Sequence, residues 1–300
     1  MMIEYKSFKS YDTEEIFYIE LGEGRPLVYV VGFGDTVEMA YPHALRWSER
    51  FHCVLFDHRG YGKTPRTSKG GVEESARDLH SLLCALNLDD VVLVGYSMGG
   101  SVAFSYFEQF GSERIGKLVL LDTNPKLIND SSWNLGLWQG LYTSEDYEHD
   151  LRAIVENPPL FHLSFFVRAS TPVSVGAPTV FPDTDDLDGW FDRALKITGL
   201  RERFLRKVFF KEAPEDQRRL ERLYWESMTG GNWLRVIEKI DVPTKCIFAD
   251  PGSFYSPRTG EWLATRLPQG TLETLSNATH MCPKEKFEDL VGIVERFGMD

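Results

Sequence analysis

One serine of this chain, Ser97, stands where a buried strand is expected to give way to a helix. The run 91–94 is short and rich in β-branched residues, and the residues that follow Ser97 are small and have helical spacing. Glycines lie two residues before the serine and two residues after it. A corner this tight strains the backbone and needs neighbours without a Cβ atom, because strand and helix pass too close for side chains. Such a corner lifts the hydroxyl clear of the sheet, where a base can activate it as a nucleophile.

The stretch Gly95-Tyr96-Ser97-Met98-Gly99 has the pattern Gly-x-Ser-x-Gly. It resembles the nucleophile elbow of the α/β-hydrolase superfamily, and the strand before it and the helix after it give the short pattern its required context. The resemblance implies an α/β fold: a mostly parallel, eight-stranded, doubly wound sheet with an inserted helical cap. It also implies that a histidine and a carboxylate from distant parts of the chain serve the serine.

The histidine that matches is His280. In the superfamily the nucleophile, the acid and the histidine follow in this order along the chain, and the histidine lies in the loop between the last strand and the last helix. His280 has this place, because a strand is expected at Thr271–Leu275 and an amphipathic helix at Lys284–Phe297. The other histidines lack this context, and we expect His280 to be the general base.

The acid is the position at which the sequence departs from the usual pattern of the superfamily. Most relatives carry it in a Gly-x-x-Asp-x-x-x-Pro turn after the seventh strand, and counting back from Pro257 places Ser253 there. A serine cannot stabilise an imidazolium ion as a carboxylate does. Asp122 ends the expected sixth strand, where many haloalkane dehalogenases and pancreatic-type lipases carry their acid, and Asp250 ends the seventh. We favour Asp122, because the end of its strand would aim it at the His280 loop, and Asp250 remains the alternative.

The resemblance also implies an oxyanion hole. A glycine-rich loop at 32–34 follows the apolar run 27–31. In the superfamily this loop usually reads His-Gly-x-Gly and supplies one backbone N–H, here that of Phe33, while the residue after the nucleophile, Met98, supplies the other. Val31 stands where the histidine is usual. Because the donors are backbone amides, this difference does not remove the function.

A third stretch, Asp-His-Arg-Gly-Tyr-Gly at 57–62, resembles a structural turn of the same superfamily. We predict that Asp57 and Arg59 form a partly buried ion pair that holds this loop. His58 is interpreted as an ordinary polar residue, and none of the three is expected to be catalytic.

Strands and helices alternate between residues 27 and 122, which predicts a parallel, doubly wound sheet. In such sheets ligands bind outside the carboxyl ends of the strands, where Gly32, Ser97 and Asp122 would all lie. The first fifty residues are strand-rich, and after residue 240 two further strands precede the last helix. The elements expected in the core are the strands Ile3–Phe8, Ile16–Glu20, Leu27–Val31, Phe51–Phe56, Lys117–Leu121 and Thr244–Ala249 and the helix Glu73–Leu88, besides those already named.

The alternation stops between residues 126 and 230, and this segment is expected to be the helical cap, with 1–125 and 231–300 forming the core. Helical runs include Arg201–Phe210 and Pro214–Met228, and Val173–Asp188 has the Pro, Gly and Asp content of a mobile loop. Aromatic residues are frequent and would line an apolar acyl or ring pocket, although any one of them more often only packs within the cap. These are Trp133, Trp138, Tyr142, Phe161, Phe165, Phe166, Phe181, Trp190 and Phe191.

The composition of the chain argues against some classes of binding partner. The 300 residues are 42% hydrophobic, which is ample for a buried core, and the formal charge of -12 disfavours nucleic acid and anionic membranes. The four cysteines are widely spaced and mostly lie beside apolar runs, so we expect buried thiols rather than disulfides or a metal site. The N-terminus has no apolar signal region, and no apolar run reaches the length of a membrane span. These features predict a cytoplasmic protein.

Together the residues predict a serine hydrolase that cleaves an ester of a small or medium apolar substrate through an acyl-enzyme, without a metal or organic cofactor. The stretches 255–257 and 260–262 also resemble non-haem haloperoxidase relatives with perhydrolase activity. A serine nucleophile disfavours the dehalogenases and epoxide hydrolases that use a carboxylate. Two alternatives stay open: a carbon–carbon hydrolase or lyase with the same residues, since the elbow also occurs in the menaquinone-pathway lyase, and a non-catalytic ligand binder. The oligomeric state is not predicted.

Overall fold

The structure is a computed structural model that describes residues 3–173, 185–199, 202–210 and 213–300. Within these residues, eight strands form one sheet in the order β1-β2-β4-β3-β5-β6-β7-β8. The pairs β1–β2 and β2–β4 are antiparallel and the other pairs are parallel, which confirms the predicted fold class. The strands are β1 (Lys6–Lys9), β2 (Glu15–Leu21), β3 (Pro26–Val30), β4 (His52–Phe56), β5 (Val91–Tyr96), β6 (Ile115–Leu121), β7 (Thr244–Pro251) and β8 (Gly270–Ala278).

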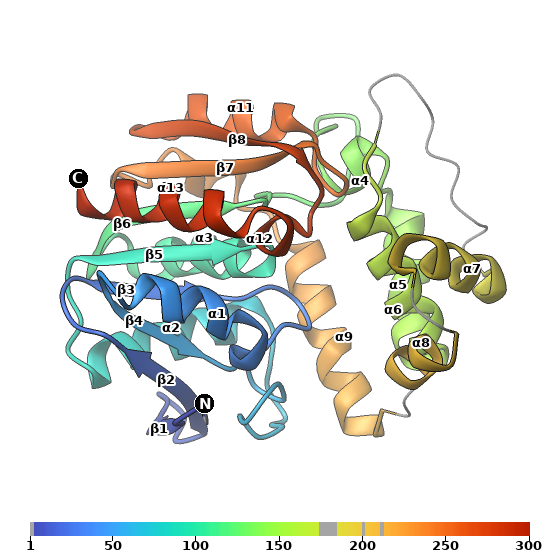
Figure 1. Cartoon of the computed structure of the whole chain (residues 1–300), viewed down its shortest axis with the longest axis horizontal. Helices are drawn as coiled ribbons and strands as arrows, with labels where there is room; N and C mark the ends of the chain where they lie inside the picture. The colour runs from blue at the N-terminus through green and yellow to red at the C-terminus, as the bar shows by residue number, and fades with distance from the viewer. Residues whose placement is uncertain (1–2, 174–184, 200–201, 211–212) are drawn as a thin grey trace.

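Helices cover both faces of the sheet, so the central strands are apolar on both sides. Along β5, Val91 and Leu93 belong to one core cluster, and Val92 and Val94 belong to the other. Figure 1 shows α1 with α12 and α13 on one face, and α2 and α3 on the other. The core helices are α1 (Val37–Trp47), α2 (Val72–Ala85), α3 (Met98–Phe110), α10 (Leu234–Ile237), α11 (Pro257–Arg266), α12 (Cys282–Glu285) and α13 (Phe287–Met299). The single helix expected at Lys284–Phe297 is thus divided into α12 and α13.

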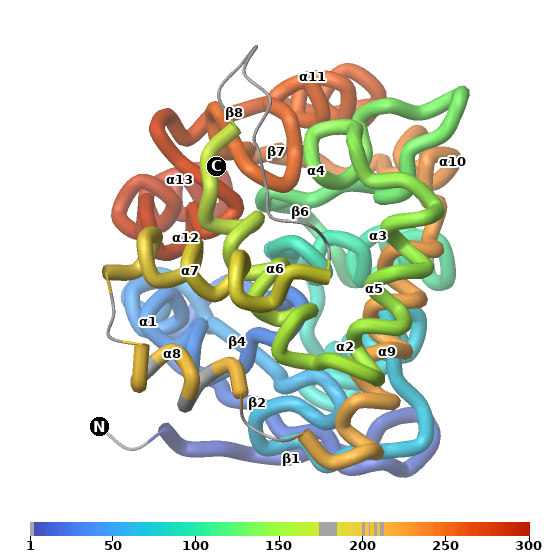
Figure 2. Tube along the Cα trace, turned by 90° about the vertical axis from the view of Figure 1, so that its right-hand side faces the viewer, coloured from blue at the N-terminus to red at the C-terminus, as the bar shows by residue number. Residues whose placement is uncertain are grey.

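Six of the described helices lie between residues 126 and 230 and stand beside the carboxyl ends of the parallel strands (Figure 1). Figure 2 looks from their side, with α5, α6 and α7 in front of the sheet. They are α4 (Leu137–Gly140), α5 (Ser144–Glu156), α6 (Pro158–Ser170), α7 (Leu187–Thr198), α8 (Glu202–Phe209) and α9 (Glu215–Gly230). We call the segment 126–230 the inserted segment; that it acts as a cap stays a prediction. Most of the loop expected at Val173–Asp188, including Phe181, lies outside the described residues.

Two further findings concern the helices and the cysteines. In the part of the chain that the structure describes, every helix is too short or too polar to cross a lipid bilayer. All four cysteines are free thiols, as expected, and three of them, Cys53, Cys246 and Cys282, are buried, whereas Cys84 is exposed.

Helix α1 was not predicted, because the first fifty residues were interpreted as strand-rich. Pro42 lies inside the helix, and an internal proline argues against a helix because it removes a backbone donor. A start signal is nevertheless present. The side chain of Thr36 accepts a hydrogen bond from the backbone N–H of Met39. The negative charge of Glu38 in the first turn interacts favourably with the positive end of the helix dipole.

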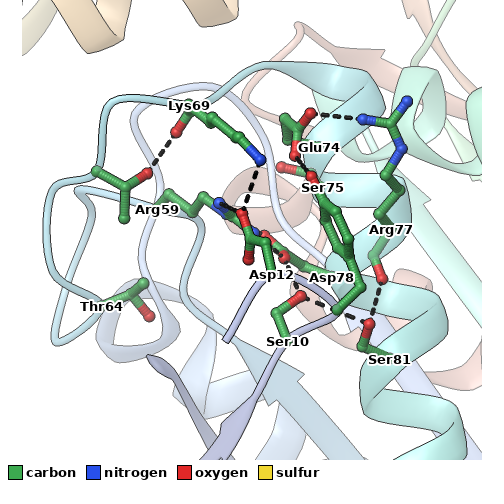
Figure 3. A network of polar contacts seen from close by, with 12 residues as sticks. Ser10, Asp12, Arg59, Thr64, Lys69, Glu74, Ser75, Arg77, Asp78 and Ser81 are labelled. Carbon is green, nitrogen blue, oxygen red and sulfur yellow. Dashed lines mark hydrogen bonds and ion pairs between the residues drawn. The ribbon is translucent and has the colours of Figure 1, made fainter. Parts of the chain in front are cut away.

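The predicted ion pair between Asp57 and Arg59 is wrong. The guanidinium of Arg59 is fully buried and donates to both oxygens of Asp78 (2.8 and 2.7 Å) and of Asp12 (2.9 Å each), as Figure 3 shows. These hydrogen bonds lower the pKa of Asp12 to about 2. Asp57 instead accepts hydrogen bonds from two backbone N–H groups, one of them that of Val37 at the start of α1 (2.8 Å). It therefore ties the turn 57–62 to the first residue of α1.

His58 is more constrained than an ordinary polar residue. Its side chain is buried, with Nδ1 3.0 Å from Ser75 Oγ and Nε2 3.2 Å from the carbonyl oxygen of Val31. Burial lowers the pKa of this imidazole to about 4, so the ring is neutral at physiological pH. The ring therefore joins the end of β3 to α2 as a neutral hydrogen-bonding group.

Candidate active site

Ser97 forms a sharp corner between β5 and α3, with φ 53° and ψ −119°. A Cβ atom on Gly95 would collide with the backbone of Gly99, and one on Gly99 would collide with the carbonyl oxygen of Val30 at the end of β3. Both positions therefore need glycine, and the close packing of strand and helix holds the serine in its strained conformation. The positive end of the α3 dipole points at this corner.

The structure brings Ser97, His280 and Asp122 together in a single hydrogen-bonded series. His280 Nε2 lies 2.8 Å from Ser97 Oγ, and His280 Nδ1 lies 2.6 Å from Asp122 Oδ2. All three side chains are buried. A carboxylate only accepts, so Nδ1 carries the proton and Nε2 is the acceptor for the serine hydroxyl. This is the protonation state that a general base for a serine needs.

Neighbouring strand ends fix the position of Asp122. Its backbone N–H donates to the carbonyl oxygen of Ile247 (2.8 Å), and its Oδ1 accepts from the backbone N–H of Ala249 (3.2 Å), both on β7. Its φ of 41° is unusual for a residue with a side chain. Asp250 is exposed on β7. Of the two carboxylates that the sequence left open, the structure thus brings Asp122 to His280.

Ser253, at the place where most relatives carry the acid, has a different function in this structure. Its hydroxyl donates to the carbonyl oxygen of Ala169 at the end of α6 (2.6 Å) and accepts from the backbone N–H of His280 (2.8 Å). The side chain is buried. It therefore connects the histidine loop to the inserted segment. Counting from Pro257 identified the position, but nothing in the sequence indicated these partners.

Replacement of Ser253 by alanine is expected to lower the free energy of unfolding by about 1–3 kcal/mol, because a buried N–H and a buried C=O lose their partner. We also expect a several-fold lower kcat, because the backbone of His280 loses a restraint. Urea unfolding and ester hydrolysis measure the two effects. Ser256→Ala, a change at the helix cap of α11 on the same loop, is the control and should leave kcat unchanged. Wild-type stability and turnover in Ser253→Ala would contradict this interpretation.

Aromatic rings hold the imidazole of His280 from several sides, which the sequence analysis missed. The ring of Tyr96 stacks on it at 5.2 Å between centroids, and the Tyr96 hydroxyl donates to the carbonyl oxygen of His280 (2.7 Å). Phe254 lies against it at 4.4 Å. The only sign of these contacts in the sequence was the position of the two residues: Tyr96 precedes the nucleophile, and Phe254 follows Ser253. These contacts restrict the ring to orientations that reach both Ser97 and Asp122.

The two expected oxyanion donors are the backbone N–H groups of Phe33 and Met98. Met98 is the first residue of α3, so its N–H has no place in the hydrogen-bond ladder of that helix. Phe33 lines the same cavity as Ser97. Its ring packs against Phe161 (6.0 Å), Phe165 (5.8 Å) and Trp225 (5.4 Å), so the inserted segment holds the loop 32–34 in place.

A cavity of about 600 Å³ opens above the serine. Ser97 and His280 form part of its wall, and the inserted segment contributes Phe165 and Phe166 from α6 and Phe209 from α8. An apolar wall with a few polar groups at the reacting end is typical of a small-molecule site. One of these groups is Asp35, and burial raises the pKa of its carboxyl to about 6, although the charge of His280 and the backbone N–H of Gly32 act in the opposite direction.

Comparison with known proteins shows what this chain is similar to. A family model described as alpha/beta hydrolase fold matches residues 25–161. A putative non-heme chloroperoxidase from Synechocystis sp. is 33% identical over 159 residues, which are 51% of this chain and 55% of that protein. A non-heme haloperoxidase from Rhodococcus erythropolis is 30% identical over 154 residues, 51% of this chain and 55% of that protein. The chain thus spans about half the length of these curated relatives.

The whole chain also superimposes on solved structures. An esterase from Exiguobacterium antarcticum has a TM-score of 0.77 at 17% identity, covering 98% of this chain and 99% of that one. A bromoperoxidase from Bacillus anthracis has a TM-score of 0.76 at 19% identity, covering 99% of this chain and 100% of that one. At such low identity these likenesses show the fold. The order of the strands, the family model and these superpositions together show that this chain has the α/β-hydrolase fold.

Proposed function

We propose that this protein is a serine hydrolase that cleaves an ester bond of a small or medium apolar substrate through an acyl-enzyme. The observation that carries the proposal is the series of short contacts from Ser97 through His280 to Asp122. Esterase and haloperoxidase relatives with the same fold support it. In this proposal Ser97 is the nucleophile, His280 the general base and Asp122 the acid.

The proposed reaction begins when His280 Nε2 takes the proton of Ser97 and the serine oxygen attacks the carbonyl carbon. Asp122, which accepts from Nδ1, stabilises the imidazolium ion that forms. The imidazolium then gives its proton to the leaving alcohol as the ester C–O bond breaks. Water, deprotonated by the same histidine, attacks the acyl-enzyme and releases the carboxylic acid and the free serine.

The backbone N–H groups of Phe33 and Met98 are the proposed donors to the oxyanion. Charge develops on the carbonyl oxygen only in the tetrahedral intermediates, so donors held in place beforehand lower the barrier more than they strengthen substrate binding. Loss of one such donor costs about 10²–10³-fold in kcat in enzymes of this kind. The packing of Phe33 against the inserted segment would keep one donor in position.

The inserted segment is the proposed cap. Phe165, Phe166 and Phe209 come from its helices and form part of the cavity wall. Burial of an apolar acyl or alkoxy group there gains about 25 cal/mol for each Å² removed from water. The same helices would exclude bulk water from the reacting atoms.

A fluorophosphonate is expected to label the wild-type protein, and peptide mass spectrometry is expected to locate the label at Ser97. The reagent reacts with a serine only when a base takes its proton and donors receive the developing oxyanion, so labelling tests the whole arrangement. Hydrolysis of p-nitrophenyl acetate and butyrate should disappear in proportion to labelling. A protein that hydrolyses neither ester and takes up no label would be a ligand-binding relative without this activity.

A further inference from the structure

The cavity that contains Ser97 carries two carboxylates in its wall, Asp35 and Glu221. Asp35 follows the loop 32–34 of the core, and Glu221 lies on α9. Tyr61 lines the cavity as well. The pKa of its hydroxyl is raised well above the usual value, mainly by burial and then by the charges of Glu221 and Asp35, among others. We call Asp35, Tyr61 and Glu221 the acidic wall.

Two polar atoms of the acidic wall lack a hydrogen-bond partner among the described residues: Glu221 Oε2 and the hydroxyl of Tyr61. Both side chains are deeply buried, each residue being only 8% exposed. Glu221 Oε1 accepts from Gln217 Nε2 (3.1 Å), and His162 Nε2 lies 3.4 Å from Oε2, where it contributes a charge only when protonated. A buried oxygen without a donor costs free energy. A ligand in the cavity that brings its own donor would remove this cost.

Asp35 is the member of the acidic wall that lies close to the nucleophile. Its Oδ2 and the Cβ atom of Ser97 lie 3.0 and 3.2 Å from the point where a Cβ of Gly32 would stand, so they are at most about 6 Å apart. Asp35 is partly exposed. With its pKa near 6, it is ionised for the most part at neutral pH and above. A negative charge therefore stands beside the position of the scissile bond.

Little positive charge opposes this wall. Arg66 lines the cavity, but it is directed to other partners: its Nη1 lies 3.1 Å from Asp216 Oδ2, and its Nε donates to Gln217 (3.0 Å). Among the residues that the structure describes, no lysine or arginine forms an ion pair with Asp35 or Glu221. Charges of one sign in a cavity with apolar walls concentrate the electric field there. The cavity therefore favours cations over anions.

We propose that the acidic wall binds a protonated amine of the substrate, so that the preferred esters carry an alkylammonium group in addition to an apolar part. An ammonium group has three donors and no acceptor, and the two carboxylates and the phenolic oxygen are acceptors for it. The same wall would repel an ester that bears a carboxylate. This inference rests on the proposed function and names its substrate class.

The test compares hexylammonium with hexanoate, two probes of similar length and opposite charge. Calorimetry on the Ser97→Ala protein at neutral pH measures binding without turnover. We expect hexylammonium to bind at least about tenfold more tightly than hexanoate, and this preference to fall severalfold in Asp35→Asn and in Glu221→Gln. Glu38→Gln on α1 and Glu215→Gln on α9 remove the same charge from exposed positions and should keep the preference.

Equal or tighter binding of hexanoate would overturn the inference, as would undetectable binding of hexylammonium. The inference would also fail if the preference for hexylammonium fell equally in the cavity variants and in their controls. Thermal unfolding checks that each variant folds. If Glu221→Gln does not fold, the comparison of Asp35→Asn with Glu38→Gln decides whether the inference holds. The two proposals fail separately. A wild-type protein that resists fluorophosphonate but prefers hexylammonium would refute only the hydrolase, whereas a labelled protein without the preference would refute only the ammonium site.

Discussion

Ser97→Ala is expected to lower kcat for p-nitrophenyl butyrate by about 10⁵–10⁶-fold and to abolish labelling by the fluorophosphonate. The substitution removes the atom that forms the acyl bond. KM or inhibitor affinity should change little, because the cavity wall loses only one oxygen atom. Steady-state kinetics and intact-protein mass spectrometry measure the two effects.

Ser101→Ala is the matched control for this experiment. Ser101 is a buried serine one turn further along α3. Its replacement should leave kcat within about twofold of the wild type and leave labelling complete, since mutations outside a catalytic arrangement act mainly on stability. Substantial turnover in Ser97→Ala would show that the observed hydrolysis comes from another group or from a contaminating esterase.

Asp122→Asn is expected to lower kcat by about 10³–10⁴-fold with the fold intact. An asparagine can present its NH₂ group to Nδ1, which favours the tautomer with the proton on Nε2, and a protonated Nε2 cannot accept the serine proton. It also removes the charge that stabilises the imidazolium ion. The amide oxygen can still accept from the backbone N–H of Ala249, so we expect little loss of stability. Kinetics with p-nitrophenyl butyrate and urea unfolding separate the two effects.

Asp250→Asn is the comparison that makes this prediction specific. Asp250 was the alternative acid, and it lies on β7, exposed, next to the strand that Asp122 follows. The structure brings Asp122 to His280, so Asp250→Asn should retain at least about half of the wild-type kcat. A larger loss in Asp250→Asn than in Asp122→Asn would reassign the acid and imply that the histidine loop rearranges in solution.

Several features were predictable because they depend on neighbours in the chain. The elbow strand, the glycines around Ser97 and the helix after it are local, since each follows from side-chain size and periodicity within a few residues. The place of His280 was predictable from the resemblance to the α/β-hydrolase superfamily, which carries its histidine between the last strand and the last helix, two elements that local patterns reveal.

Other features depend on segments that are far apart in the sequence. Arg59 binds Asp12 and Asp78 instead of Asp57, because those carboxylates enter the same buried space from other elements. The hydroxyl of Ser253 serves the backbone of His280 and the end of α6. Hydrogen bonds of this kind leave no periodic pattern in the sequence, so motif reasoning does not detect them.

The sequence by itself determined that the chain forms an α/β sheet, with a serine at a strand-to-helix corner and a histidine in a loop near the C-terminus. It left two aspartates at the ends of adjacent strands as candidates for the third position. Only the tertiary structure decided which of them lies beside His280, and which carboxylates share the cavity with Ser97. The physical reason is that spacing along a chain determines the element on which a residue lies, whereas hydrogen bonds and charge interactions depend on distances of a few ångströms between elements, which packing alone sets.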